Sequence, residues 1–312
     1  MSKNHYKYIF AILLFALLFW LVDLEQLVLA LSQLTVELAV YLIFLSVVLT
    51  FISAFKWKLF IDFFERSASL FRLFRLYLVG YFFNLLIPSY VGGDVVRSWY
   101  VGKKIGMHQA AAATILERFT GFVAMIILAL VFMWFVEVVT WQIQLTIGVL
   151  ALGLIAVSLI AVSKRSLDLF NRFGLLRSVE SHAQRLQLAF QLASRSPSLI
   201  IKTMVLSFLF HTVTVVNVLA AALAVGWYGV PISDLFVVLP IILLIGSIPI
   251  SPSGLGIQEG AFMFFLTALG ASPAEALGIG ILLRAKTYIL ALVGGVFWLG
   301  ERSQGEGVST GS

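Results

Sequence analysis

Residues 252–286, PSGLGIQEGAFMFFLTALGASPAEALGIGILLRAK, decide the fold, because this apolar stretch carries the charged side chains Glu259, Arg284 and Lys286. A charged side chain costs about 2.5 to 3.5 kcal/mol at the centre of a membrane helix. Charges that remain in a membrane segment therefore face a partner or a water-filled cavity. The stretch predicts a membrane-embedded site rather than a plain anchor.

The start of the same stretch predicts a helix that breaks and restarts inside the membrane. Pro252 cannot donate a backbone hydrogen bond, and Gly254 and Gly256 do not continue a helix easily. We expect the helix to restart near Ile257. The N–H groups and the positive dipole end at such a break favour an anionic ligand.

Composition indicates a polytopic helical membrane protein. Of the 312 residues, 61% are hydrophobic and 12% are charged. Apolar runs of roughly 17 to 25 residues recur along the chain, each long enough to cross the hydrocarbon core. The longest polar interval, 164–202, is too short for a domain with its own core. We expect one membrane domain over residues 1–300 and a disordered cytoplasmic tail over residues 301–312.

The apolar runs predict an all-α fold with about six full spans and two broken helical hairpins. The expected hairpins cover residues 76–104, which are flanked by basic residues at both ends, and residues 233–270. Residues 59–75 alternate aromatic and charged side chains, which predicts a helix at the membrane surface. The expected full spans are residues 8–22, 38–55, 111–136, 141–163, 203–225 and 275–299.

The two hairpins share a short motif. The segment 88–94, PSYVGGD, resembles the segment 252–259, PSGLGIQE, and each combines Pro-Ser, glycines and a carboxylate. Opposed re-entrant hairpins that meet at mid-depth are typical of inverted-repeat transporters, although a match this short also arises by chance. The expected hairpin tips are Pro88, Gly92, Gly93, Pro252, Gly254 and Gly256.

The formal net charge of +6 is distributed on one side of the predicted membrane. Basic residues cluster at the amino terminus, in residues 56–75 and in residues 164–202, whereas the loops assigned to the outside lack Lys and Arg. The positive-inside rule then places both termini in the cytoplasm and the protein in the cytoplasmic (inner) membrane. Anionic lipid headgroups are the expected partners, and nucleic acid is not, because no folded basic domain accompanies the charge.

Four segments carry a family resemblance: NLLIPSYVGGDVVRSWYV (84–101), LERFTGF (116–122), ISPSGLGIQEGAF (250–262) and LLRAKTYILALVGG (282–295). In this order they resemble the lysylphosphatidylglycerol synthase transmembrane region, also called the flippase-like domain family, over nearly the whole chain. The resemblance implies lipid handling. In bifunctional members this region is thought to move aminoacylated phosphatidylglycerol made by a soluble carboxy-terminal domain. Here the sequence stops at Ser312, so we do not carry over the aminoacyl transfer activity or that lipid substrate.

The first group of candidate substrate-binding residues is Asp94, Arg97, Glu117 and Arg118. Asp94 follows two glycines and is either an N-cap or a ligand, and Arg97, one turn later, either snorkels to the surface or holds a phosphate. Glu117 and Arg118 are about 100° apart on a helix, so each needs a different partner. In one interpretation both lie at the membrane interface, at the start of the predicted helix 111–136. In the other, Arg118 lies in the substrate cavity.

The second group is Glu259 and Arg284. They form either a structural pair or a site in which Arg284 is shared between Glu259 and a lipid phosphate, and we favour the second. Lys286 is turned about 200° from Arg284, so we expect it to be peripheral. For His211 we expect a helix-packing hydrogen bond rather than a metal, and no cofactor or metal is predicted.

Three classes of function remain open. A lipid translocase explains the buried charges and the broken helices, and it is the preferred interpretation. An intramembrane transferase would need a general base and often a cluster of carboxylates, which the spacing does not indicate. The third class is an accessory protein of a lipid-modifying enzyme. The absence of cysteine excludes disulfides and a thiolate nucleophile.

Overall fold

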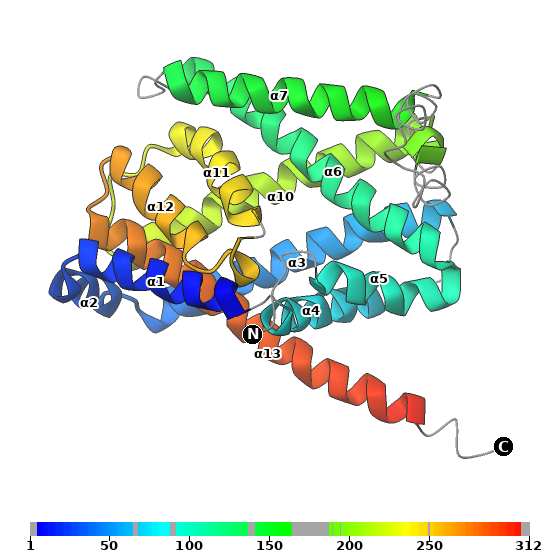
Figure 1. Ribbon diagram of the computed structural model, residues 1–312, viewed down its shortest axis with the longest axis horizontal. Helices are drawn as coiled ribbons and strands as arrows, with labels where there is room; N and C mark the ends of the chain where they lie inside the picture. Colours follow the sequence, from blue (N-terminus) through cyan, green and yellow to red (C-terminus); the bar gives the residue numbers. More distant parts are fainter. Residues whose placement is uncertain are drawn as a thin grey trace. The chain divides into compact units, whose positions relative to one another are not determined.

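The computed structural model describes residues 5–64, 68–87, 92–136, 141–163, 187–188, 190–193, 195–248 and 250–306. Every regular element in these residues is a helix, which confirms the all-α class (Figure 1). The elements are α1 (His5–Leu21), α2 (Leu24–Ser32), α3 (Val36–Phe64), α4 (Leu70–Leu86), α5 (Gly92–Ile105), α6 (Met107–Phe132), η1 (Met133–Phe135), α7 (Trp141–Val162), α10 (Pro197–Ala224), α11 (Ile232–Ser247), η2 (Pro252–Gly254), α12 (Ile257–Ala268) and α13 (Pro273–Glu306).

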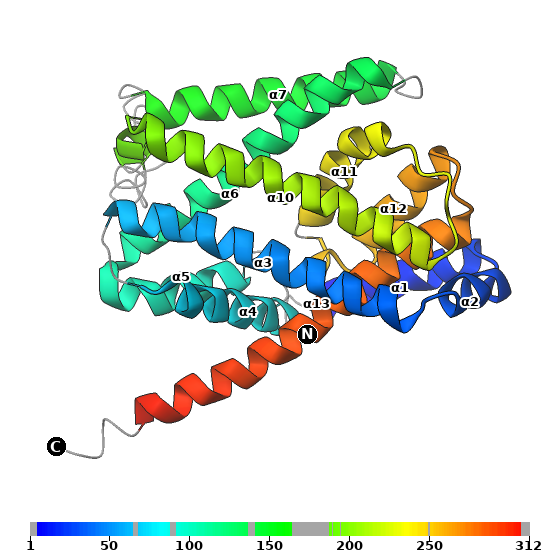
Figure 2. The ribbon, with the colours of Figure 1, turned by 180° about the vertical axis from the view of Figure 1, so that it is seen from behind.

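Within the described residues, five helical segments are long and apolar enough to cross a membrane: α3, α6 with η1, α7, α10 and α13. The bent pair α1 and α2 gives a sixth if it crosses as one span. Figure 2 shows α3 and α10 as long uninterrupted helices. The polytopic membrane architecture is therefore confirmed.

The amino-terminal region differs from the sequence prediction. The expected external loop at residues 23–37 contains α2, which is bent by 91° from α1. Asp23 starts this helix, because its carboxylate Oδ1 accepts hydrogen bonds from the N–H of Glu25 at 2.9 Å and of Gln26 at 3.4 Å. A predicted loop acid is thus a helix N-cap.

The predicted surface helix at residues 59–75 is wrong as a separate element. Helix α3 continues to Phe64, and α4 begins at Leu70, so the range is divided between two helices. Of the aromatic residues in this range, Phe60 is fully buried, whereas Phe63 and Phe71 are 37% and 64% exposed, so the range is only partly in a packed interior. The predicted basic segment 164–202 lies mostly outside the described residues.

The chain divides into two compact units. Unit 1 contains Met1–Phe51, Phe74–Arg97 and Thr212–Ser312. In it, α12 packs against α11 and α13, while α1 contacts α12 and α2 contacts α13. Its hydrophobic core is built from α10, α11, α12 and α13 with part of α3. The break between α11 and α12 is buried in part, because Ser251 is 1% exposed whereas Ile248 and Ile250 are 43% and 46% exposed.

Unit 2 contains Ile52–Leu73 and Ser98–His211, and in it α6 packs against α7. Its interior includes Trp57, Phe60 and Ile147, none of which is measurably exposed. Helix α7 is apolar on all faces, and its Leu152 and Leu159 are 68% and 66% exposed. A helix of this kind is stable in contact with lipid and not with water.

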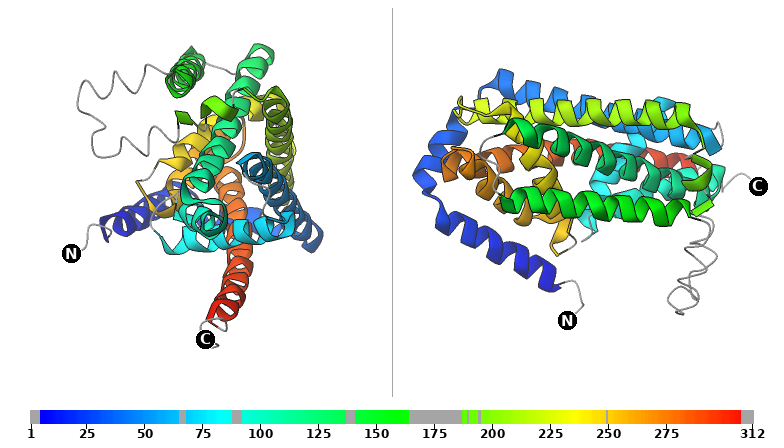
Figure 3. Two further views of the ribbon diagram at one scale, coloured as in Figure 1. Left: turned by 90° about the vertical axis from the view of Figure 1, so that its right-hand side faces the viewer. Right: turned by 90° about the horizontal axis from the view of Figure 1, so that it is seen from above.

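Helix α13 runs without interruption from Pro273 to Glu306 (Figure 3). Of the range predicted to be a disordered tail, residues 301–306 belong to this helix, and residues 307–312 lie outside the described residues. Within unit 1, a Cβ built on Gly294 would lie 1.9 Å from the carbonyl oxygen of Leu78. Glycine at this position lets α13 approach the backbone of α4.

Candidate functional site

Unit 1 contains two helix breaks, the first between α4 and α5 and the second between α11 and α12. At the second break the helix restarts at Ile257, as predicted. Gly254 and Gly256 have φ values of 69° and 81°, in the left-handed region that favours glycine. A Cβ on Gly254 would also lie 2.3 Å from the carbonyl oxygen of Gly246. Both backbone conformation and close packing therefore require glycine at residue 254.

Arg284 of α13 holds this break together. Its Nε donates a hydrogen bond to Glu259 Oε1 at 2.5 Å, and its Nη1 donates to the carbonyl oxygen of Ser253 at 2.7 Å. Its Nη2 donates to the carbonyl oxygen of Gly254 at 3.2 Å and to Gln258 Oε1 at 3.3 Å. The guanidinium, with a side chain only 12% exposed, is thus an internal ligand of the broken backbone.

Glu259 is equally engaged. Its Oε1 accepts from Arg284, and its Oε2 accepts from the N–H of Gly256 at 2.7 Å, so the carboxylate also caps α12. The residue is 1% exposed. A Cβ on Gly280 would lie 3.3 Å from the Cα of Glu259, so glycine there lets α13 pack closely against the backbone of α12. The contacts favour the structural-pair interpretation of Glu259 and Arg284.

The first break lies between α4 and α5, and its predicted tip Pro88 lies outside the described residues. Asn84 Oδ1 accepts a hydrogen bond from the N–H of Gly93 at 2.7 Å. A Cβ on Gly93 would lie 2.0 Å from the carbonyl oxygen of Gly80, so α4 and α5 are in backbone contact there. Gly92 and Gly93 do not have left-handed φ values, and close packing is what requires glycine.

One hydrogen bond joins the two breaks. Ser253 Oγ donates to the carbonyl oxygen of Asn84 at 2.5 Å, and both residues belong to unit 1. The helical partner of that carbonyl would be the N–H of residue 88, but residue 88 is a proline and has no N–H. The hydroxyl of Ser253 therefore satisfies an acceptor that the proline leaves open. We call the connected set Asn84, Gly93, Ser253, Glu259 and Arg284 the break junction.

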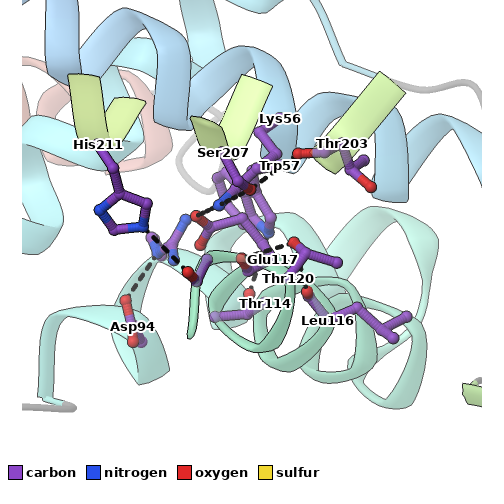
Figure 4. Close-up of polar contacts among 12 residues, drawn as sticks. Lys56, Trp57, Asp94, Thr114, Leu116, Glu117, Thr120, Thr203, Ser207 and His211 are labelled. Atoms are coloured by element: carbon purple, nitrogen blue, oxygen red, sulfur yellow. Dashed lines mark hydrogen bonds and ion pairs between the residues drawn. The ribbon is translucent and has the colours of Figure 1, made fainter. Parts of the chain in front are cut away.

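A second ion pair follows the first break. Arg97 Nε lies 3.0 Å from Asp94 Oδ1, with side chains 2% and 9% exposed (Figure 4). Arg97 Cζ also lies 4.0 Å from the ring centroid of Tyr77. The snorkelling interpretation of Arg97 is wrong, because the side chain is buried. Asp94 lies inside the first turn of α5 rather than at its N-cap, since the helix begins at Gly92.

Unit 2 holds a third buried ion pair. Lys56 Nζ lies 3.3 Å from Glu117 Oε1, both side chains are at most 6% exposed, and Nζ also donates to Ser207 Oγ at 3.2 Å (Figure 4). Beside it, Trp57 Nε1 donates to Thr114 Oγ1 at 3.0 Å. Lys56 and Trp57 therefore face the interior of unit 2, with exposures of 4% and 0%. In a sequence, an aromatic residue next to lysines is equally compatible with a membrane interface and with a protein interior. In the second case, a carboxylate on another helix pairs with the lysine.

The remaining candidates are divided between the units. Arg118 is partly buried and belongs to unit 2 with Glu117, whereas Asp94, Arg97, Glu259 and Arg284 belong to unit 1. His211 Nε2 lies 3.0 Å from the carbonyl oxygen of Gly121, which confirms the helix-packing hydrogen bond. Within the described ranges, His, Asp and Glu side chains form no group of three that could hold a metal ion.

Lys286 does not have the peripheral position that we expected. Its Nζ donates a hydrogen bond at 2.5 Å to Oδ1 of Asn217 on α10, and Asn217 is 1% exposed. Helical spacing separates Lys286 from Arg284 correctly, but both of these cations point into unit 1. They reach different neighbours there.

Sequence reasoning missed Asn84, which contributes both a side chain and a carbonyl to the break junction. A signal was present, because a proline four residues after a helical residue always leaves that residue's carbonyl without its usual donor. Asn84 precedes Pro88 by four positions. The identity of the replacement donor, Ser253, could not be read from that spacing.

These features define a polytopic membrane protein of the kind in which broken helices and buried ion pairs occur within the membrane-spanning part. Residues 7–295 match the family described as Lysylphosphatidylglycerol synthase TM region, and the chain belongs to this family. The match covers both breaks and all three buried ion pairs described above. Comparisons with curated proteins and with solved structures gave no match.

Proposed function

We propose that this protein is a lipid translocase of the cytoplasmic membrane. The substrate is an anionic phospholipid, an aminoacyl-phospholipid or a lipid-linked intermediate. The observation that carries the proposal is the break junction, in which two interrupted helices meet through Ser253 and Asn84. A buried ion pair follows each interruption, Asp94 with Arg97 and Glu259 with Arg284.

The polar headgroup is the part of a lipid that crosses the hydrocarbon core at a high cost in free energy. Irregular backbone at membrane depth is stable only where protein or a wet cavity surrounds it. The break junction supplies such backbone, and side-chain hydrogen bonds from Ser253, Glu259 and Arg284 hold it, so it can rearrange without unfolding a whole helix. The paired charges keep the resting state neutral and supply polar groups to a passing headgroup.

The proposed partners are anionic membrane lipids and a lipid-modifying enzyme. Membership of a family of membrane domains supports a role within the bilayer. The cytoplasmic orientation inferred from the basic residues would concentrate anionic lipids at that face. Where the substrate is a modified lipid, a lipid-modifying enzyme supplies it.

Reconstitution tests the proposal. Proteoliposomes containing tail-labelled phosphatidylglycerol are treated with an impermeant quencher, and the rate at which inner-leaflet label becomes quenchable is measured. We expect the wild type to exceed protein-free vesicles and Asn84→Leu, which lacks the amide oxygen that binds Gly93, to be slower. Gly153→Ala is the matched control, because a Cβ there meets nothing within 4 Å.

Two outcomes contradict the proposal. Folded protein that moves neither phosphatidylglycerol nor lysylphosphatidylglycerol faster than empty vesicles do, with or without an imposed ion gradient, excludes translocase activity for this substrate class. A new lipid species detected by mass spectrometry in the same vesicles, after addition of a soluble donor, would instead indicate an intramembrane transferase.

A further inference from the structure

Lys286 is a cation midway along the membrane span Pro273–Gly300. Among the described residues, its only polar contact is Oδ1 of Asn217, at 2.5 Å, and it makes no ion pair. The three buried cations Lys56, Arg97 and Arg284 each have a carboxylate partner. Lys286 differs from all three, because only a neutral amide faces its ammonium group.

Asn217 supports the same conclusion independently. Lysine can only donate, so the oxygen of the amide must face Lys286, and this fixes the orientation of the amide. Its Nδ2 group then points away from Lys286, where it is buried without a hydrogen-bond partner in the described part of the chain. A buried amide donor without an acceptor is unfavourable, so this N–H is available to a group that accepts hydrogen bonds.

Arg284 is less available than Lys286 to bind such a group. Two residues before Lys286, it already makes four hydrogen bonds to the break between α11 and α12. The about 200° turn between the two side chains directs them to different neighbours. These contacts favour a structural role for Arg284, and they make Lys286, which we expected to be peripheral, the better candidate for a headgroup ligand.

We propose that Lys286 and Asn217 form an anion site for the phosphate oxygens of a phospholipid headgroup, in which the ammonium supplies charge and the amide N–H a second donor. This inference rests on the proposed translocase function for its biological role, but it is a statement about binding. Inorganic phosphate presents the same oxygens and is the alternative source of the ligand.

The decisive variant is Asn217→Asp. The carboxylate has nearly the shape of the amide, keeps the acceptor for Lys286 and supplies the missing counter-charge. The folded protein should therefore be at least as stable as the wild type. The variant also removes the free N–H and places a negative charge where the phosphate would bind. A site for anions predicts lost binding with retained stability, whereas a purely structural hydrogen bond predicts no loss of binding.

The measurement is equilibrium binding of tail-labelled phosphatidylglycerol to purified protein in detergent, with labelled diacylglycerol as the phosphate-free probe. We expect Asn217→Asp and Lys286→Gln to bind phosphatidylglycerol about tenfold or more weakly, as for the loss of one hydrogen bond to a charged group. Lys286→Arg keeps the charge and should retain most of the affinity. Lys202→Met removes an exposed lysine from the same helix as Asn217 and should have no effect.

Competition by inorganic phosphate distinguishes the two sources. Phosphate that stabilises the wild type and not Asn217→Asp, without specific phosphatidylglycerol binding, assigns the site to the free anion. Unchanged phosphatidylglycerol affinity in folded Asn217→Asp and Lys286→Gln overturns the proposal, as does an equal loss of diacylglycerol binding. Binding that depends on Lys286 in a protein that moves no lipid would leave this site standing and reject only the translocase function.

Discussion

Ser253 Oγ donates a hydrogen bond of 2.5 Å to the backbone carbonyl oxygen of Asn84, and this contact joins two helix breaks that are 169 residues apart in the sequence. The hydroxyl replaces the donor that Pro88 lacks. Ser253 itself has a φ of 51°, which is unusual for a residue with a side chain. The surrounding contacts therefore hold the serine in an unfavourable conformation, and the hydroxyl contact gives a reason for it.

Replacing Ser253 tests this relationship. We expect Ser253→Ala to lower the free energy of unfolding by about 0.5 to 1.5 kcal/mol, because one hydrogen bond is lost. Ser253→Gly loses the same hydroxyl but adopts the left-handed conformation without strain, so it should be less destabilised than the alanine variant. Thermal unfolding in detergent measures both. Equal stability of Ser253→Ala and the wild type would show that the hydroxyl contact contributes nothing.

Arg284→Ala should be among the most damaging single changes. It leaves the buried carboxylate of Glu259 without its cation, which typically costs about 3 to 5 kcal/mol. The double variant Glu259→Gln with Arg284→Ala should recover only part of this loss, because the carbonyl groups of Ser253 and Gly254 still lack their donors. Lysine at 284 cannot reproduce the fork of donors and should also be impaired. Full recovery of stability in the double variant would show that Arg284 acts only as a counter-charge for Glu259.

Glycine replacements separate close packing from general sensitivity. Gly93→Ala places a Cβ 2.0 Å from the carbonyl oxygen of Gly80 and should separate α4 from α5, with loss of stability and of transport. Gly254→Val should be worse still, because it adds a backbone conformation that valine rarely adopts. Gly148→Ala is the control, since its Cβ meets nothing within 4 Å. Fully active Gly93→Ala and Gly254→Val proteins would exclude the breaks as part of the site.

The Lys56–Glu117 pair allows a double-mutant cycle in unit 2. Either Lys56→Met or Glu117→Leu alone removes one partner of this buried ion pair and should cost several kcal/mol, roughly 3 to 5. Together they remove both charges, so stability should largely return. Lys58→Met is the matched control, because Lys58 pairs with Asp62 at a partly exposed site and should cost about 1 kcal/mol or less. Additive losses in the cycle would contradict a direct pairing of Lys56 with Glu117.

The orientation in the membrane remains a prediction from the basic residues. Both termini should be cytoplasmic, because this arrangement places the basic segments on one side and the loops without Lys or Arg on the other. Reporter fusions at each end, and one in the loop between α10 and α11, measure it. A carboxy terminus outside the cytoplasm would overturn the topology and the opposed arrangement of the two hairpins.

Several elements could be predicted because they depend on local chemistry. The membrane spans follow from apolar runs long enough to cross a bilayer, and the restart of the helix at Ile257 follows from Pro252, Gly254 and Gly256. The prediction failed at residues 59–75, because α3 continues to Phe64 and α4 begins at Leu70, and a pattern of aromatic and charged residues does not show where one helix ends and the next begins. The start of α2 at Asp23 was not predicted, because aspartate is common both in loops and at the N-caps of helices.

The sequence by itself determined which segments are apolar, where they break and which residues bring charge into them, because these properties reside in single residues and short spacings. Only the tertiary structure decided which partner each charge has. Helical periodicity separates Arg284 from Lys286, but it does not say that Arg284 finds Glu259 and two carbonyl groups while Lys286 finds only Asn217. The physical reason is that a buried charge is stabilised by groups that packing brings within hydrogen-bonding distance, and those groups come from helices remote in the chain.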